Sequence, residues 1–280
     1  MAISLSVIIP IILLALACEY VDSTLGMGYG TTLTPILMLV FGFDVLQIVP
    51  AVLLSELLSG LLAAFLHHKH GNVNLKPHTL EFNEISKQLK SIGYIESFKK
   101  NTPLHLKIAI LLAVCSIAGT LAAVFIAVNI PQYWLKIYIG GLVLTMGIVV
   151  LICMNKSFRF SWSKMTILGI IASFNKGLSG GGYGPVVTSG QVLSGVDGKS
   201  AVGITSFAEG LTCFVGVSLY LLSKSQSCDL RLAPWLCIGS LAAVPLSAIT
   251  VSKVNEKKFK AVIGCFAIAI GAFTLIKTIW

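Results

Sequence analysis

The sequence predicts an all-α integral membrane protein of about ten transmembrane segments, arranged as two inverted repeats of five segments each. Three observations predict this class: an apolar composition, a duplicated glycine motif and an uneven distribution of basic residues. Of the 280 residues, 56% are hydrophobic and only 11% are charged, and the mean hydropathy is +0.91. A soluble domain carries about 25% charged residues, so this composition places the chain in a lipid bilayer.

A glycine-rich motif occurs twice. The stretch 22–32 (DSTLGMGYGTT) recurs without a gap as 175–185 (NKGLSGGGYGP), 153 positions later. At the same offset Gly28 matches Gly181 and Glu56 matches Glu209. A second match relates 119–124 to 239–244 at an offset of 120, because the first half has a longer middle loop. Two matches in the same order indicate a duplication, with repeat halves 4–153 and 163–279.

Ten apolar segments use nearly the whole length, so we expect a single membrane domain, 1–280. In chain order they are 4–20, 31–43, 46–66, 106–127, 133–153, 163–176, 184–195, 199–222, 232–251 and 258–279. Most approach the ~20 residues that cross a hydrocarbon core. Segments 31–43 and 184–195 are too short, and 163–176 is marginal. Short segments beside glycine motifs in both halves are typical of the broken helices that form a transporter's substrate site.

The basic residues indicate the orientation. If the short segments also traverse the membrane, giving five crossings per half, fourteen lysines and arginines fall on one side and four on the other. Cytoplasmic loops carry the excess of basic residues, so the loops of the first group, including 67–105, are predicted to be cytoplasmic and both termini outside. An odd number of crossings per half inverts the second half. The spacing of Phe82, Ile85, Leu89 and Ile92 predicts an amphipathic surface helix within that loop.

The two glycine clusters are predicted to form an anion site. Unwound backbone is tolerated at membrane depth only where it is buried in protein or faces a wet cavity. The amide groups and dipole of a helix that restarts there attract anions. The candidate binding residues are Gly26, Gly28, Gly30, Thr31 and Thr32 in the first half, and Ser179, Gly180, Gly181 and Gly182 in the second. The alternative is that these glycines only allow helices to approach closely.

Four charged residues within the apolar segments are further candidates. Burying the unpaired charge of Lys176 near the bilayer centre would cost about 2.5–3.5 kcal/mol, so this lysine requires an anion. The anion could be the substrate or Asp22 in a structural pair, unless Lys176 lies nearer the interface and extends outward. Asp22, Glu56 and Glu209 are candidates for coupling transport to protons. Neighbouring serines and threonines leave a structural role open for both glutamates.

Asp44 and Asp197 each follow a glycine and one apolar residue, at the start of a long apolar segment. Aspartate is a preferred N-cap residue, because its side chain accepts a hydrogen bond from the first turn of the helix. Both are therefore predicted to be helix N-caps.

Other chemistries are disfavoured. Residues 177–181 (GLSGG) match the G-x-S-x-G elbow of serine hydrolases, but that elbow needs a preceding strand and a histidine partner. All five histidines lie in or beside the loop 67–105, and the seven cysteines form no CxxC pair. We therefore expect no enzyme, cofactor or metal site. The net charge of +9 reflects membrane orientation rather than nucleic-acid binding.

The motifs resemble those of the TauE/SafE family of sulfite exporters. The resemblance rests on 25–30 (LGMGYG) with Pro35, on 177–185 (GLSGGGYGP) and on 70–74 (HGNVN), and it spans both halves. It implies transport of a small sulfur-containing anion, such as sulfite, thiosulfate or an organosulfonate, across the plasma membrane. The remaining alternatives are an anion channel and a membrane-embedded enzyme or scaffold of sulfur metabolism. Assembly into a homo-oligomer stays open.

Overall fold

The computed structural model describes residues 5–77, 101–153, 160–223, 229–251 and 256–280, and within these ranges it is all-helical. The helices of the first half are α1 (Leu5–Leu25), α2 (Tyr29–Leu39), α3 (Val45–Lys69), α5 (Leu104–Asn129) and α6 (Gln132–Cys153). Those of the second half are α7 (Trp162–Ser179), α8 (Tyr183–Leu193), α9 (Gly198–Leu222), α10 (Ala233–Thr250) and α11 (Glu256–Ile279). The predicted amphipathic helix lies outside the described residues.

Six of the described helices are long and apolar enough to cross a membrane: α1, α3, α5, α6, α9 and α10. Together with the apolar residues exposed on their outer faces, such as Leu121 and Phe125 on α5, they make this a multi-pass membrane protein. Large apolar side chains on the surface of a helical bundle are stable when lipid covers them.

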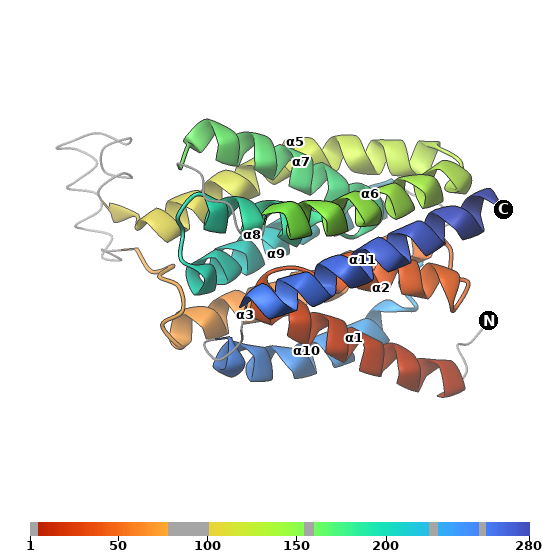
Figure 1. The fold of residues 1–280 in the computed structure, drawn as a ribbon, viewed down its shortest axis with the longest axis horizontal. Helices are drawn as coiled ribbons and strands as arrows, with labels where there is room; N and C mark the ends of the chain where they lie inside the picture. Colours follow the sequence, from red (N-terminus) through yellow and green to blue (C-terminus); the bar gives the residue numbers. More distant parts are fainter. Residues whose placement is uncertain (1–4, 78–100, 154–159, 224–228, 252–255) are drawn as a thin grey trace.

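The two short helices are half-crossings. Each of α2 and α8 has 11 residues, which is about 16 Å of helix and roughly half of a ~30 Å hydrocarbon core. In Figure 1, α2 turns back toward the end of the molecule at which α1 begins, and α8 turns back toward the beginning of α7. The pairs α1–α2 and α7–α8 are thus hairpins that enter from opposite ends of the bundle. The prediction that each short segment traverses the membrane is not confirmed, because α2 and α8 each turn back within the bundle.

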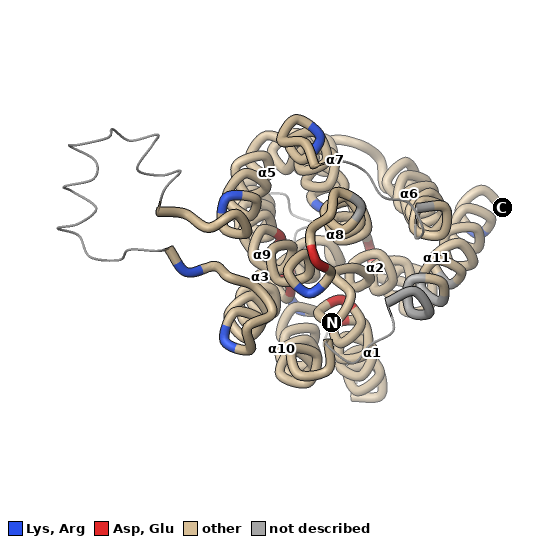
Figure 2. The backbone as a smooth tube through the Cα atoms, turned by 60° about the vertical axis from the view of Figure 1, so that its left-hand side comes forward, with Lys and Arg blue, Asp and Glu red and all other residues tan. Residues whose placement is uncertain are grey.

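The packing of the bundle is nearly unchanged when the two halves are exchanged. Helix α1 packs along α10 as α7 packs along α5, and α10 packs on α3 as α5 packs on α9. The pairs α3–α9 and α6–α11 each join one helix to its counterpart in the other half. Figure 2 shows α6 and α11 side by side at one edge, with the other helices grouped around α2, α3, α8 and α9.

In the structure, equivalent glycines of the two breaks are separated by one residue more than the gapless repeat predicts. Gly26 and Gly28 have positive φ angles between α1 and α2, and Gly180 and Gly182 have positive φ angles between α7 and α8. These positions are 154 apart, whereas the helix-capping Asp44 and Asp197 are 153 apart. The difference arises because five residues join α2 to α3 and four join α8 to α9. Asp22 and Lys176 therefore occupy matching positions.

The boundaries of the breaks also differ from the predicted ones. Helix α1 continues to Leu25 and α7 to Ser179, so the breaks contain three residues each, 26–28 and 180–182. Ser179 lies in the last turn of α7 rather than within the break, and Gly30 lies inside α2. Both aspartates are N-cap residues, but only Asp197 accepts a bond from its helix, at 3.4 Å from Ser200 N. The predicted side-chain cap of Asp44 is wrong.

Candidate functional site

The tips of the two hairpins meet backbone to backbone in the middle of the bundle. A Cβ atom added at Gly30 would overlap the carbonyl oxygen of Gly180, and one added at Gly184 would overlap that of Gly26. The hydroxyl of Thr31 accepts a hydrogen bond from Gly182 N at 3.1 Å. At Gly30 and Gly184 the missing side chain therefore serves close packing, which was the alternative explanation of the glycine clusters.

Lys176 lies beside these tips and forms two buried ion pairs. It projects from the last turn of α7 and is 1% exposed. Its ammonium Nζ contacts a carboxylate oxygen of Glu56 on α3 and lies 2.7 Å from Oε1 of Glu209 on α9. Removing one partner of a buried pair costs about 3–5 kcal/mol because the other charge stays buried. These pairs replace the predicted structural pair with Asp22.

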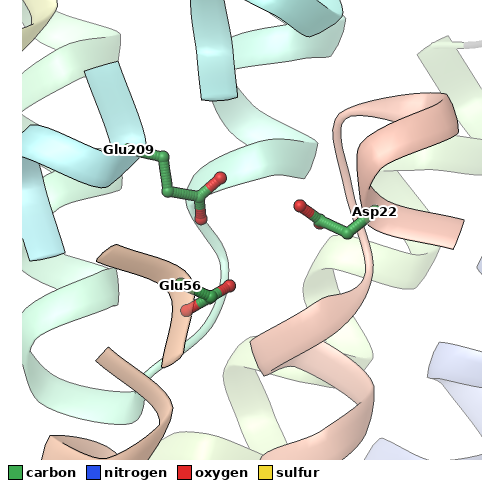
Figure 3. A group of neighbouring side chains, drawn as sticks. All are labelled: Asp22, Glu56 and Glu209. Atoms are coloured by element: carbon green, nitrogen blue, oxygen red, sulfur yellow. The ribbon is translucent and has the colours of Figure 1, made fainter. Parts of the chain in front are cut away.

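Asp22 joins the same group from α1. Carboxylate oxygens of Asp22, Glu56 and Glu209 lie within 4.8 Å of one another, and the three side chains point toward a common centre (Figure 3). Asp22 Oδ1 also accepts a hydrogen bond from Tyr29 N at 3.2 Å. We call Asp22, Glu56, Glu209 and Lys176 the charge cluster. It holds three carboxylates and a single ammonium group, contributed by four helices.

Several amides of the breaks already have acceptors. Gly181 N donates to Ser179 Oγ at 3.1 Å, and Gly182 N and Tyr29 N donate to the oxygens described above. In α2 the first helical bond runs from Thr32 N to Gly28 O at 2.9 Å. The N–H groups of Gly30 and Thr31 precede it and have no acceptor within the helix. The amides open to a ligand are thus fewer than the sequence suggested.

The hydroxyls near the tips differ between the halves. Thr188 on α8 donates to Gly26 O at 2.7 Å and lies 2.9 Å from the Thr205 hydroxyl, which also accepts from Gln191 Nε2. Its counterpart Thr34 on α2 is fully buried, and its hydroxyl has no partner among the described residues. Thr32 is half-buried, and no described hydrogen bond involves its side chain. The structure does not bring Thr32 into the charge cluster.

Glu19 is a buried acid that the sequence analysis missed. It lies on α1 one turn before Asp22 and is 2% exposed. Its two carboxylate oxygens accept hydrogen bonds from Ser23 at 2.6 Å and from Ser59 at 3.0 Å. The signal was available, since an acidic residue within an apolar segment is costly and therefore informative. Glu19 lies within the predicted segment 4–20 but outside the duplicated glycine motif on which the site prediction was based.

A membrane-embedded bundle with two broken hairpins and charged residues at their tips is typical of membrane transporters. The sequence model of the sulfite exporter TauE/SafE family matches residues 11–80 and 89–274. The chain belongs to this family of membrane transporters, and the membership predicted from the glycine motifs is confirmed.

One relative supports this assignment. The chain is 27% identical over 279 residues to a protein of Bacillus subtilis (strain 168) described as "Probable membrane transporter protein YtnM". The alignment covers 94% of this chain and 81% of that protein. None of the solved structures matches the chain.

Proposed function

We propose that the protein is a secondary transporter that moves a small sulfur-containing anion, such as sulfite, thiosulfate or an organosulfonate, across the plasma membrane. The observation that carries the proposal is Lys176, a buried cation placed where the tips of the two broken hairpins meet. Family membership supports an anionic sulfur substrate. The N–H groups of Gly30 and Thr31, which have no acceptor within α2, and the hydroxyl of Thr34, which has no partner among the described residues, offer neutral donors nearby.

The composition of the charge cluster supports the further proposal that protons accompany the anion. With every group ionised it carries three negative charges and one positive charge, so an approaching anion meets net repulsion. A pair of like charges 4 Å apart costs about 4 kcal/mol at an effective dielectric constant of 20. Protonation of Glu56 and Glu209 would release Lys176 from both ion pairs and expose its ammonium group to the anion. Binding of anion and protons would then be mutually dependent.

The two halves, 4–153 and 163–279, would act as inverted repeats. Their packing is nearly unchanged by exchange, and the hairpins enter from opposite ends. Rocking of one half against the other would open the tips first to one side and then to the other. Lys176, Glu56 and Glu209 are all buried in the described state. Such closure supports a transporter over a channel, whose conducting path must be continuous.

The test is flux of sulfite, thiosulfate, sulfate and taurine into proteoliposomes containing the purified protein. We expect saturable uptake of at least one sulfur anion, accelerated by a pH difference across the membrane. A binding screen by thermal shift on the same preparation identifies which anion stabilises the protein. Linear, unsaturable conductance would identify a channel. Absence of flux and of any stabilisation for all four anions would refute the proposal.

Proton coupling is tested by Glu209→Gln. Glutamine keeps the size of the side chain and an oxygen facing Lys176 but cannot exchange a proton. We expect anion flux down its own gradient to persist and its acceleration by a pH difference to disappear. Flux that still follows the pH difference would remove Glu209 from the coupling mechanism.

A further inference from the structure

A polar stripe connects the charge cluster to one end of the bundle. We call that end the loop end, because α3, α6 and α10 end there and α5, α7 and α11 begin there. The opposite end is the terminal end, because α1 begins and α11 ends there (Figure 1). On α3, Glu56, Ser59 and His67 follow one another at helical spacing and lie on one face. Opposite them α1 presents Glu19 and Ser23, and all five residues are at most 3% exposed.

The stripe ends at His67, whose protonation state is defined by its neighbours. Nε2 lies 2.9 Å from Ser23 O, which can only accept, so Nε2 carries the hydrogen. Nδ1 lies 3.1 Å from the Asn72 side-chain nitrogen, which also donates to Ala248 O at 3.2 Å. Nδ1 therefore accepts, and His67 is neutral. The titratable group between His67 and the charge cluster is Glu19, held by Ser23 and Ser59.

The second half repeats this architecture without its acid and its base. Tyr220 on α9 matches His67 and donates to Gly177 O at 2.8 Å, as His67 donates to Ser23 O. The counterpart of Glu19 is Ser173, whose hydroxyl bonds Gly169 O on its own helix. Thr212, the counterpart of Ser59, likewise bonds Ala208 O on its own helix. From the charge cluster toward the terminal end, the three described counterparts, Tyr220, Ser173 and Thr212, are all hydroxyl side chains.

We propose that Glu19 is a second proton-binding site, which exchanges protons between the charge cluster and the loop end alone. In the step, a carboxylic acid of Asp22 or Glu56 gives its proton to the Glu19 carboxylate, so one acid is lost and one is formed. When the loop end opens, Glu19 releases that proton to water. The direction in which the proton moves rests on the proposed function. The assignment of Glu19 as a proton-binding site rests on its contacts alone.

The groups that face Glu19 determine this exchange. Cys18 and Asp22 lie on the same helix as Glu19, Tyr29 lies on α2 and Glu209 on α9. The helices α3 and α10, which also pack on α1, carry Glu56, His67 and Cys237, and Lys176 belongs to the charge cluster. Of these, the carboxylates are the groups that can exchange a proton with Glu19, and the neutral His67 can take one only by giving up its bond with Asn72. Tyr29 is engaged with Ser55, whose hydroxyl lies 2.8 Å from its own.

Two measurements test the proposal with Glu19→Gln, which can keep hydrogen bonds to both serines. The first is an infrared titration of purified protein without any anion, where we expect one titrating carboxyl group fewer than in the wild type. The second is sulfite flux in oriented proteoliposomes. We expect the variant to lose most of its response to pH at the loop end, about tenfold or more, and to keep its response at the terminal end.

Controls make the outcomes decisive. Ser173→Ala, at the matching position of the second half, should keep both pH responses, and Glu19→Asp should restore the one that Glu19→Gln loses. An unchanged number of titrating carboxyl groups in Glu19→Gln overturns the proton site. An unchanged response at the loop end overturns the one-sided route. If the wild type moves no anion, the proposed function fails, and the infrared titration still decides whether Glu19 binds a proton.

Discussion

The two hairpins share a backbone but differ in charge. Both break at a pair of glycines with positive φ, and both restart with a buried tyrosine, Tyr29 or Tyr183. At the matching position four residues before the break, however, the first hairpin has Asp22 and the second has Lys176. The duplicated backbone supplies the place where the tips meet, and the difference between the halves supplies the chemistry.

This difference explains how the cluster holds together. A symmetric pair of lysines would repel, and a symmetric pair of aspartates would leave Glu56 and Glu209 without a buried cation. One ammonium group between the glutamates of α3 and α9 links a helix of the first half to a helix of the second. A contact that joins both halves is well placed to change when one half rocks against the other.

The largest effect on anion flux is expected from removing or exchanging the charges at the matching positions 22 and 176. Lys176→Ala removes the cation, and we expect anion flux to fall at least about 100-fold, which corresponds to a loss of about 3 kcal/mol at 1.4 kcal/mol per tenfold. The double variant Asp22→Lys/Lys176→Asp keeps the same set of charges with the halves exchanged, so it should recover part of the flux that Lys176→Asp alone loses.

Flux in proteoliposomes and elution as a single species in detergent are the two readouts for these variants. Flux of Lys176→Ala at the wild-type rate would remove this lysine from the mechanism. A double variant as inactive as Lys176→Asp, though well folded, would show that the matching positions are not interchangeable.

The sequence pointed to the residues of the charge cluster, although not to their pairing, and it misplaced the register of the breaks by one residue. Lys176, Glu56 and Glu209 were found because an ionisable residue inside an apolar segment is costly and rarely without a role. The gapless offset of 153 is correct for Glu56 and Glu209 but wrong by one residue for the breaks. A single residue is missing between α8 and α9, and only backbone angles show which glycines match.

The role of the glycines could not be predicted from the sequence. A glycine is required both where amides are exposed to an anion and where two backbones come into contact, because it has no Cβ atom. The sequence alone therefore does not distinguish the two roles. The structure separates them at Gly30 and Gly184, where opposing carbonyl groups occupy the space of a side chain. Glu19 was missed for another reason, because it precedes the duplicated glycine motif on which the site prediction was based.

An intermediate effect is expected from filling the contact between the tips. Gly30→Ala places a methyl group on the backbone of Gly180, which cannot turn aside as a flexible side chain can. Overpacking usually costs about 1–3 kcal/mol, and we expect at least the upper value here. The matched control is Gly141→Ala on α6, where a Cβ would meet nothing within 4 Å. Alanine in a helix interior should raise stability there by about 0.5–1 kcal/mol.

Thermal melting in detergent compares the two glycine variants. A melting temperature that falls for Gly30→Ala and is kept or raised for Gly141→Ala supports contact between the hairpin tips. Equal melting temperatures would mean that the tips separate readily in the ground state, contrary to the described packing.

The smallest effects are expected at the two matching threonines, Thr188 and Thr34, which differ in their hydrogen bonds. Thr188→Val removes the hydroxyl that pairs with Gly26 O and Thr205 and should cost about 1–3 kcal/mol of stability, the usual cost of orphaned buried partners. Thr34→Val removes a hydroxyl that has no partner among the described residues, so we expect little change in melting temperature. If this free hydroxyl donates to the anion, the KM for the transported anion should rise about tenfold, because hydrogen bonds to charged groups contribute about 1.5–3 kcal/mol. Measuring melting temperature and KM for both variants separates the two roles, and an unchanged KM in Thr34→Val would exclude Thr34 from the binding site.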